Sequence, residues 1–187
     1  MFKRENLTIP NCLSLSRIVF LPALFALVWL EMPLAFTILY AVIGSTDLWD
    51  GMIARRLNQK TDLGKSLDSI ADLFFYLSTA YFIHALYAVY LEPNLILLYV
   101  FLSFLALSFV VSAIRCKKPI LMHTVLLKLC AVLVYALMIF SYFFDTTRFI
   151  TAILFIYFVA FTEEIAIFIK YGEVDPDTPF LFSLMKR

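Results

Sequence analysis

Long apolar runs alternate along the chain with short clusters that contain charged residues or proline. We place helices at residues 11–30, 34–54, 66–90, 94–114, 120–144 and 148–170. Each run is close to the ~20 residues that a transmembrane helix needs. The runs are also continuous, whereas the strands of a membrane barrel would alternate apolar and polar positions over about ten residues. The pattern therefore predicts an all-α bundle of six transmembrane helices.

The composition agrees with a membrane location. Of the 187 residues, 63% are hydrophobic and 16% are charged, which excludes an ordinary water-soluble domain. The net charge of +1 argues against a general nucleic-acid binder, because neutralising phosphates takes a basic excess. The four glycines argue against a nucleotide-binding α/β fold, and the three cysteines show no metal or disulfide spacing. We expect one membrane domain over residues 1–187, with a short cytoplasmic tail at 171–187.

The basic residues predict the orientation of the bundle. Fourteen of the 15 lysines and arginines lie at or near one face, and only Arg148 lies by the other. Short loops rich in lysine and arginine stay in the cytoplasm, so we expect both termini to be cytoplasmic. Lys3 and Arg4 precede the first apolar run, as in a signal peptide, but the run is too long and no clear cleavage site follows it. We interpret this run as a retained span.

Four aspartates occur where the second and third predicted helices approach the cytoplasm: Asp47, Asp50, Asp68 and Asp72. Ionisable groups in a membrane cost ~2.5–3.5 kcal/mol each on insertion scales, so they indicate a function. The members of each pair are three or four residues apart and share a helical face. The turn between the helices would bring the two faces together. Their mutual repulsion would then require a cation or protonation.

A set of carboxylate oxygens favours a hard divalent cation, Mg²⁺ or Mn²⁺, and four carboxylates are enough for two ions. Ca²⁺ would act as an inhibitor-like substitute, and zinc is disfavoured because no cysteine or histidine lies nearby. The alternative is that the aspartates are helix caps, solvated charges, or salt-bridge partners of Arg55, Arg56 and Lys65. For four acids at helical spacing on adjacent helices, we favour the metal site.

The residues between the two acidic pairs predict a phosphate ligand. Gly51 and Ala54 follow Asp50 on one stripe of the helix, which leaves a shallow surface for a planar group. Arg55 adds a cation beside this stripe. Gly64 opens the next helix, whose N-terminal N–H groups favour an anion. With two metal ions, this arrangement suits a diphosphate.

The stretch from Asp47 to Asp72 reads D-x2-D-G-x2-A-R-x8-G-x3-D-x3-D. It resembles the signature of the CDP-alcohol phosphotransferase (CDP-alcohol phosphatidyltransferase) family in every fixed position. The length, the six predicted spans and the start Pro10-Asn11 followed by Arg17 are similar to bacterial members of the phosphatidylglycerophosphate-synthase type. The resemblance covers essentially the whole chain.

The resemblance implies a reaction and residue roles. Asp47, Asp50 and Asp68 would bind two divalent ions, and Asp72 would lie near a metal and act as general base. The cytidine would lie near Gly51, Ala54 and Gly64, and the diphosphate would lie on the metals and Arg55. A phosphatidyl group would pass from CDP-diacylglycerol to an alcohol with release of CMP. The resemblance also implies a homodimer in a bacterial inner membrane, with its active site facing the cytoplasm.

Basic residues after the fourth predicted helix suggest a phosphate-bearing acceptor such as glycerol 3-phosphate. The candidates for contacting it are Arg115, His123, Thr124 and Lys128, with Thr124 and Lys128 one helical turn apart in the fifth span. Lys117 and Lys118 are explained by the orientation bias. Inositol, inositol phosphate, serine and phosphatidylglycerol remain alternative acceptors. Glu163 and Glu164 in the sixth span either face the pocket, pair with a basic residue or make a structural hydrogen bond.

Two other classes of protein stay open. A divalent-cation transporter would also carry acids on two helices, although transport sites lie at the bilayer midplane and these acids lie near one face. A non-catalytic membrane protein that binds the nucleotide-linked lipid would keep the same residues.

Overall fold

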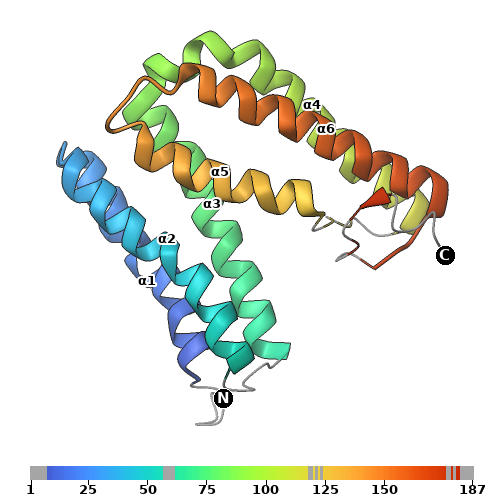
Figure 1. Ribbon diagram of the computed structural model, residues 1–187, viewed down its shortest axis with the longest axis horizontal. Coiled ribbons are helices and arrows are strands. Elements are labelled where there is room, and N and C mark those ends of the chain that lie inside the picture. The colour runs from blue at the N-terminus through green and yellow to red at the C-terminus, as the bar shows by residue number, and fades with distance from the viewer. Residues whose placement is uncertain are drawn as a thin grey trace. The chain divides into compact units, whose positions relative to one another are not determined.

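The structure is a computed structural model that describes residues 8–56, 62–117, 120, 122, 124–175, 178 and 180–181. Among these residues the regular elements are all helical, which confirms the predicted all-α class. They are α1 (Ile9–Trp29), α2 (Pro33–Arg56), α3 (Asp62–Leu91), the short 3₁₀ helix η2 (Glu92–Asn94), α4 (Leu95–Cys116), α5 (Val125–Phe140) and α6 (Thr147–Tyr171) (Figure 1).

The helices have the apolar character of a membrane protein. Within the described residues, three stretches are long and apolar enough to cross a bilayer, namely Asn11–Trp29, Ile70–Cys116 and Thr147–Tyr171. The apolar helices Pro33–Asp47 and Val125–Phe140 are shorter. The count of six spans and the cytoplasmic position of the termini stay predictions.

The fifth helix is shorter than predicted. The apolar run predicts one span over 120–144, but the helix covers Val125–Phe140. The amide of Ile120 donates to Ser112 Oγ at 3.1 Å, and the amide of Met122 donates to Glu164 Oε1 at 2.8 Å. Side chains of α4 and α6 therefore accept hydrogen bonds from these two amides. Ile120 and Met122 are apolar because they pack in a hydrophobic cluster, and that burial does not require a helix.

The chain divides into two compact units by its internal contacts. The first comprises Met1–Ala88 with Ser141–Phe143, and the second comprises Val89–Phe140 with Phe144–Arg187. α3 departs from helical geometry at Tyr87 (φ −133°, ψ 33°), next to the boundary between the units. The assignment of one domain to residues 1–187 stays a prediction.

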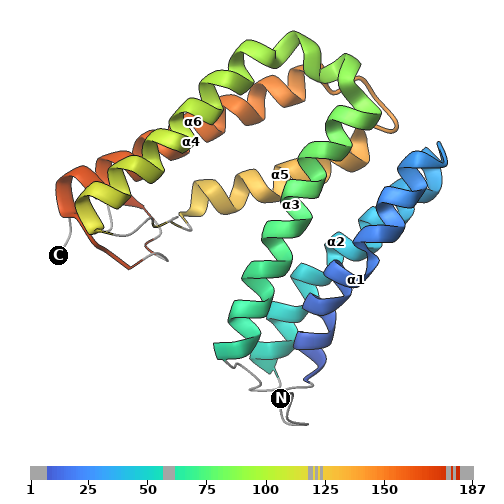
Figure 2. The same cartoon turned by 180° about the vertical axis from the view of Figure 1, so that it is seen from behind.

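In the first unit, α1, α2 and the part of α3 up to Ala88 lie side by side (Figure 2), and aromatic side chains pack between them. Phe36 and Phe82 are both fully buried, with ring centroids 5.0 Å apart in an edge-on arrangement. The Tyr40 ring stacks on Phe75 at 4.9 Å, and its hydroxyl lies 2.9 Å from Thr79 Oγ1. These contacts fix α3 against α2. Phe75 lies one helical turn after Asp72, and the other contacts lie further from the end of α2 and the start of α3, where the predicted acidic residues are.

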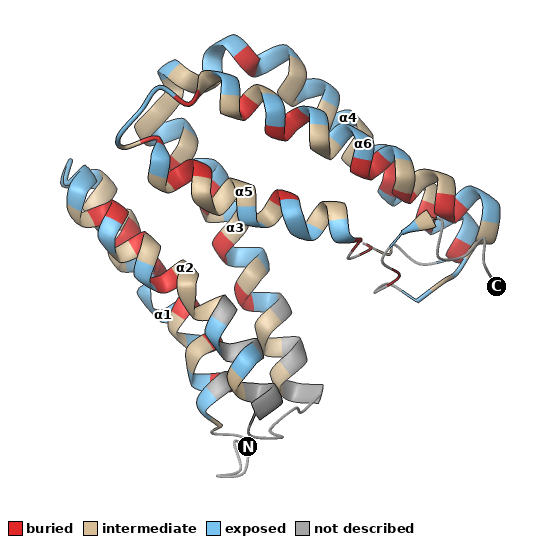
Figure 3. Cartoon of the chain, in the orientation of Figure 1, coloured by how far each residue is buried: buried red, intermediate tan, exposed pale blue. Residues whose placement is uncertain are grey.

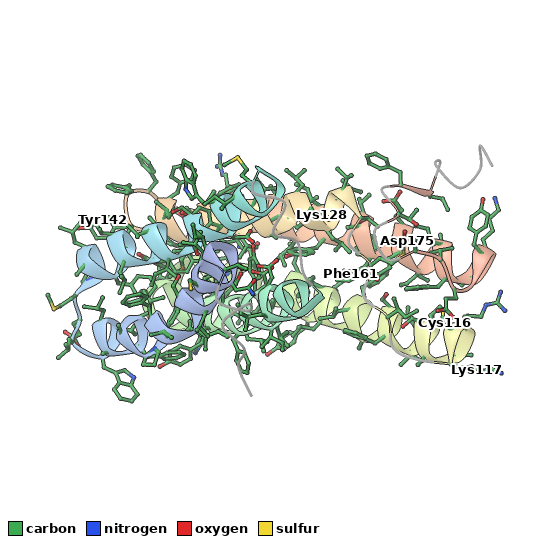
Figure 4. All side chains as sticks on the ribbon, turned by 90° about the horizontal axis from the view of Figure 1, so that it is seen from below. Cys116, Lys117, Lys128, Tyr142, Phe161 and Asp175 are labelled. Atoms are coloured by element: carbon green, nitrogen blue, oxygen red, sulfur yellow. The ribbon has the colours of Figure 1, made fainter. Side chains whose placement is uncertain are left out.

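In the second unit, α4 and α5 both pack on α6, and buried positions recur along α6 (Figure 3). Figure 4 labels the buried Phe161 of α6 and Lys117 at the end of α4. At the start of α6, the hydroxyl and the amide of Thr147 donate to Asp145 Oδ1 at 2.6 and 2.8 Å. These hydrogen bonds lower the pKa of the exposed Asp145 carboxyl.

Candidate functional site

Three of the four predicted aspartates converge at one end of the first unit. Asp47 of α2 and Asp68 and Asp72 of α3 each offer a carboxylate oxygen, and these three atoms lie within 4.8 Å of one another. The three side chains are 41%, 39% and 34% exposed, so solutes can reach them. The set consists of hard oxygen donors and matches the chemistry of Mg²⁺ and Mn²⁺. The side chain of Asp50 lies outside the described residues.

A buried arginine lies among these carboxylates. Arg17 of α1 is only 1% exposed, and its Nη1 donates to Asp47 Oδ1 at 3.1 Å. Nη1 also donates to Asp72 Oδ1, and Nη2 donates to Asp68 Oδ1. The planar guanidinium carries several donors in a fixed fork, which lets one side chain bridge carboxylates on two helices. We call these four residues the aspartate–arginine centre.

The polar face of α1 explains how Arg17 reaches the centre. Asn11, Ser14 and Arg17 follow one another at intervals of three residues, and all three are buried. Residues three apart share a face of a helix, so this short polar stripe faces inward. Ser14 Oγ donates to Asp68 Oδ1 at 3.4 Å. Thr8 caps the start of α1, with its hydroxyl oxygen accepting from the Asn11 amide at 3.4 Å.

Sequence reasoning missed the place of Arg17. In the sequence it is one of the basic residues of one face and part of the family-like start of the chain. The salt-bridge alternative named Arg55, Arg56 and Lys65 instead, and their side chains lie outside the described residues. A signal for Arg17 was present, because an arginine inside an apolar helix carries the same membrane cost as the aspartates and therefore needs partners.

The predicted nucleotide-binding residues lie on the helix ends next to the centre. Gly51, Ala54 and Arg55 belong to the last turns of α2, and Gly64 belongs to the first turn of α3. The backbone of these turns is described, but the side chains of Ala54 and Arg55 are not. The cytidine and diphosphate contacts stay predictions.

The predicted acceptor residues belong to the second unit. Arg115, at the end of α4, is exposed and donates from Nη2 to the Ile169 carbonyl of α6. The Lys128 amide donates to the Thr124 carbonyl at 3.0 Å, so the two residues lie one helical turn apart as predicted, although Lys128 is exposed and Thr124 is fully buried. Thr124 also precedes α5, and its hydroxyl accepts from the Leu127 amide at 3.3 Å, which caps the helix start. His123 lies outside the described residues.

Both glutamates of α6 make structural hydrogen bonds. Glu164 is fully buried, and its Oε1 accepts from the Met122 amide at 2.8 Å. Glu163 Oε1 accepts from the Leu181 amide at 2.9 Å. The pair could face the pocket, pair with a basic residue or make structural hydrogen bonds, and the last of these alternatives matches the contacts. The two carboxylates tie the segment before α5 and part of the C-terminal segment to α6.

These features define an all-helical membrane protein that carries clustered aspartates on two adjacent helices. The chain matches the sequence profile of the CDP-alcohol phosphatidyltransferases over residues 7–162, and it belongs to this family of phosphatidyltransferase enzymes.

Several curated relatives carry the name CDP-diacylglycerol–glycerol-3-phosphate 3-phosphatidyltransferase. The relative from Aquifex aeolicus is 41% identical over 69 residues, which are 37% of this chain and 39% of the relative. The relative from Rickettsia bellii is 41% identical over 71 residues, 36% of this chain and 38% of the relative. The Escherichia coli K12 relative is 37% identical over 67 residues, 34% of this chain and 37% of the relative. The matches thus span under half of each relative's length. No solved structure matches the chain significantly.

Proposed function

We propose that the protein transfers a phosphatidyl group from CDP-diacylglycerol to a small alcohol and releases CMP. The observation that carries this proposal is the convergence of Asp47, Asp68 and Asp72, whose oxygens lie within 4.8 Å of one another in a member of this family. The intact spacing from Asp47 to Asp72 supports the same reaction.

The carboxylates suit a pair of divalent ions. Asp47, Asp50 and Asp68 would hold Mg²⁺ or Mn²⁺, with Asp72 beside them. When bound, these ions supply neutralisation of the charge on the diphosphate. The hard oxygen donor set of the centre supports this choice of metals over zinc.

Asp72 is the proposed general base. Its carboxylate takes the proton of the acceptor hydroxyl, the hydroxyl oxygen forms a new bond to the phosphorus of the phosphatidyl group, and the bond from that phosphorus to CMP breaks in line. The reaction needs no covalent enzyme intermediate. The contact from Arg17 Nη1 to Asp72 Oδ1 supports a fixed orientation of this carboxylate.

The donor is proposed to lie with its acyl chains in the bilayer and its head group at the aspartates. Gly51, Ala54 and Gly64 are proposed to receive the cytidine, and Arg55 is proposed to contact the diphosphate. The position of the aspartates near the ends of apolar helices supports a donor that is part lipid and part nucleotide.

Glycerol 3-phosphate is the proposed acceptor. The names of the relatives support it, because each gives glycerol 3-phosphate as the group that is modified. The sequence-based candidates for binding it stay Arg115, His123, Thr124 and Lys128.

The protein is also proposed to be a homodimer in a bacterial inner membrane, with the centre facing the cytoplasm. Its mass in mild detergent tests the dimer.

The test is CMP release by the purified full chain in detergent. CDP-diacylglycerol and Mg²⁺ or Mn²⁺ are supplied with glycerol 3-phosphate, inositol, inositol phosphate, serine or phosphatidylglycerol in separate reactions. We expect metal-dependent CMP with glycerol 3-phosphate. CMP with another acceptor alone would contradict the choice of acceptor, and no CMP with any acceptor would contradict the reaction.

A further inference from the structure

We propose that Arg17 is a built-in cation of the aspartate–arginine centre that competes with divalent ions for the carboxylates and gives the metal-loaded centre a positive charge. The competition follows from the contacts alone. The second part, attraction of a diphosphate, rests on the proposed function.

The competition is indicated by which atoms Arg17 uses. Its guanidinium donates to one oxygen of each of Asp47, Asp68 and Asp72, the same three side chains that approach closely enough to share an ion. A guanidinium is always charged and has no acceptor, so it interacts with these carboxylates as a cation and repels another cation. A divalent ion that binds the same carboxylates must therefore displace some of these contacts or tolerate a nearby positive charge.

The aromatic packing argues that Arg17 is not needed to hold the two acidic helices together. α2 and α3 are joined by the Tyr40–Thr79 hydroxyl contact and by the edge-on packing of Phe36 on Phe82. Neither contact involves Arg17. The helix segments that carry Asp47 and Asp72 would therefore stay together after the arginine is replaced, and the main change at the centre would be the loss of a competing charge.

The charges of the centre give Arg17 a second consequence. The four aspartates of the motif carry four negative charges, and Arg17 offsets one of them. With Asp50 counted together with the centre, two divalent ions would then give a net charge of one positive unit. Without Arg17 the loaded centre would be neutral. A positive centre attracts the anionic diphosphate of the donor more strongly than a neutral one.

The first experiment measures Mn²⁺ binding without any substrate. Arg17→Met and Arg17→Gln remove the charge, Arg17→Lys keeps it, and Arg148→Met is the control because Arg148 is exposed at the start of α6. Free Mn²⁺ is followed by electron paramagnetic resonance in detergent. We expect both neutral variants to bind Mn²⁺ about tenfold more tightly than the wild type, because a like charge a few ångströms away has been removed. Arg17→Lys and Arg148→Met should stay near the wild type.

A purely structural role for Arg17 predicts the opposite direction. Weaker or unchanged Mn²⁺ binding in both neutral variants would overturn the competing role. Neutral variants that fold only with Mn²⁺ present would support it, since the ion would then replace the missing cation. Variants that fail to fold with and without Mn²⁺ would overturn it.

The second experiment measures the binding of CDP, a soluble diphosphate probe, at saturating Mn²⁺ by calorimetry. We expect CDP to bind Arg17→Gln about tenfold more weakly than the wild type, and Arg148→Met to bind it normally. Equal CDP affinity in Arg17→Gln would overturn the second part. Absence of CDP binding to the wild type would contradict the proposed function together with this part, whereas the Mn²⁺ comparison would still decide the competing role.

Discussion

Arg17 Nη1 lies 3.1 Å from Asp47 Oδ1, so the first helix supplies a buried positive charge to an acid of the second. The same nitrogen contacts Asp72 of the third helix. One arginine thus connects a predicted metal ligand with the predicted general base. Removing one member of this network leaves the others without that partner, which makes the centre sensitive to single substitutions.

The first prediction concerns the proton acceptor. Asp72→Asn keeps the size of the side chain but removes the basic carboxylate, so CMP release should fall by about 10²–10⁴-fold. The initial rate of CMP release in detergent measures this. Asp145→Asn is the matched control, because Asp145 is exposed and lies outside the first unit. An Asp72→Asn enzyme with the rate of the control would exclude Asp72 as the base.

The second prediction concerns metal removal. A chelator should abolish CMP release, and Mg²⁺ or Mn²⁺ should restore it, because the donor set consists of carboxylate oxygens. Asp47→Asn should raise the Mn²⁺ concentration that gives half of the maximal rate. The measurement is a metal titration of the chelated wild type and variant. Full activity of the wild type after exhaustive chelation would contradict the metal requirement.

The third prediction concerns the structural hydrogen bond of α6. Glu164→Ala leaves the buried Met122 amide without its acceptor, which should lower the free energy of unfolding by about 1–3 kcal/mol. Glu164→Gln retains an acceptor oxygen and should lower it less. Thermal unfolding in detergent compares both variants with Glu92→Gln, a substitution at an exposed position. If Glu164→Ala unfolds at the same temperature as Glu92→Gln, this hydrogen bond does not stabilise the second unit.

The fourth prediction concerns the acceptor. Lys128→Ala should raise the KM for glycerol 3-phosphate by about tenfold, the loss expected when one charged contact to a phosphate is removed. The KM for CDP-diacylglycerol should not change. Lys170→Ala, at an exposed lysine of α6 that lies over the Tyr171 ring, is the matched control. Steady-state kinetics, with each substrate varied in turn, give the KM values of both variants. Equal KM values for glycerol 3-phosphate in Lys128→Ala and Lys170→Ala would remove Lys128 from the acceptor site.

Hydrophobic periodicity and the spacing of acids predicted a large part of this molecule. The helical class follows from the apolar runs, and the approach of Asp47 to Asp68 and Asp72 follows from helical spacing on two helices that are separated by five residues of sequence. Both are local properties. The boundaries of α5 were not predictable in the same way, because Ile120 and Met122 are apolar for packing and their amides bond to side chains distant in sequence.

The partners of the charged groups could not be predicted from the sequence. Arg17 precedes Asp68 by 51 residues and Glu164 follows Met122 by 42, so neither contact is visible in local spacing. The chain has 14 other basic residues, so charge alone does not distinguish Arg17. The packing of α1 against α2 and α3 brings Arg17 to the carboxylates.

The most direct test of the account is the stoichiometry of the proposed reaction. Purified wild-type protein is supplied with CDP-diacylglycerol, glycerol 3-phosphate and Mn²⁺, and the CMP and the phosphatidylated acceptor are quantified together. The account predicts one molecule of the new lipid for each CMP, and neither product after chelation. CMP without the new lipid, or the same yield of both products in Asp72→Asn, would contradict it.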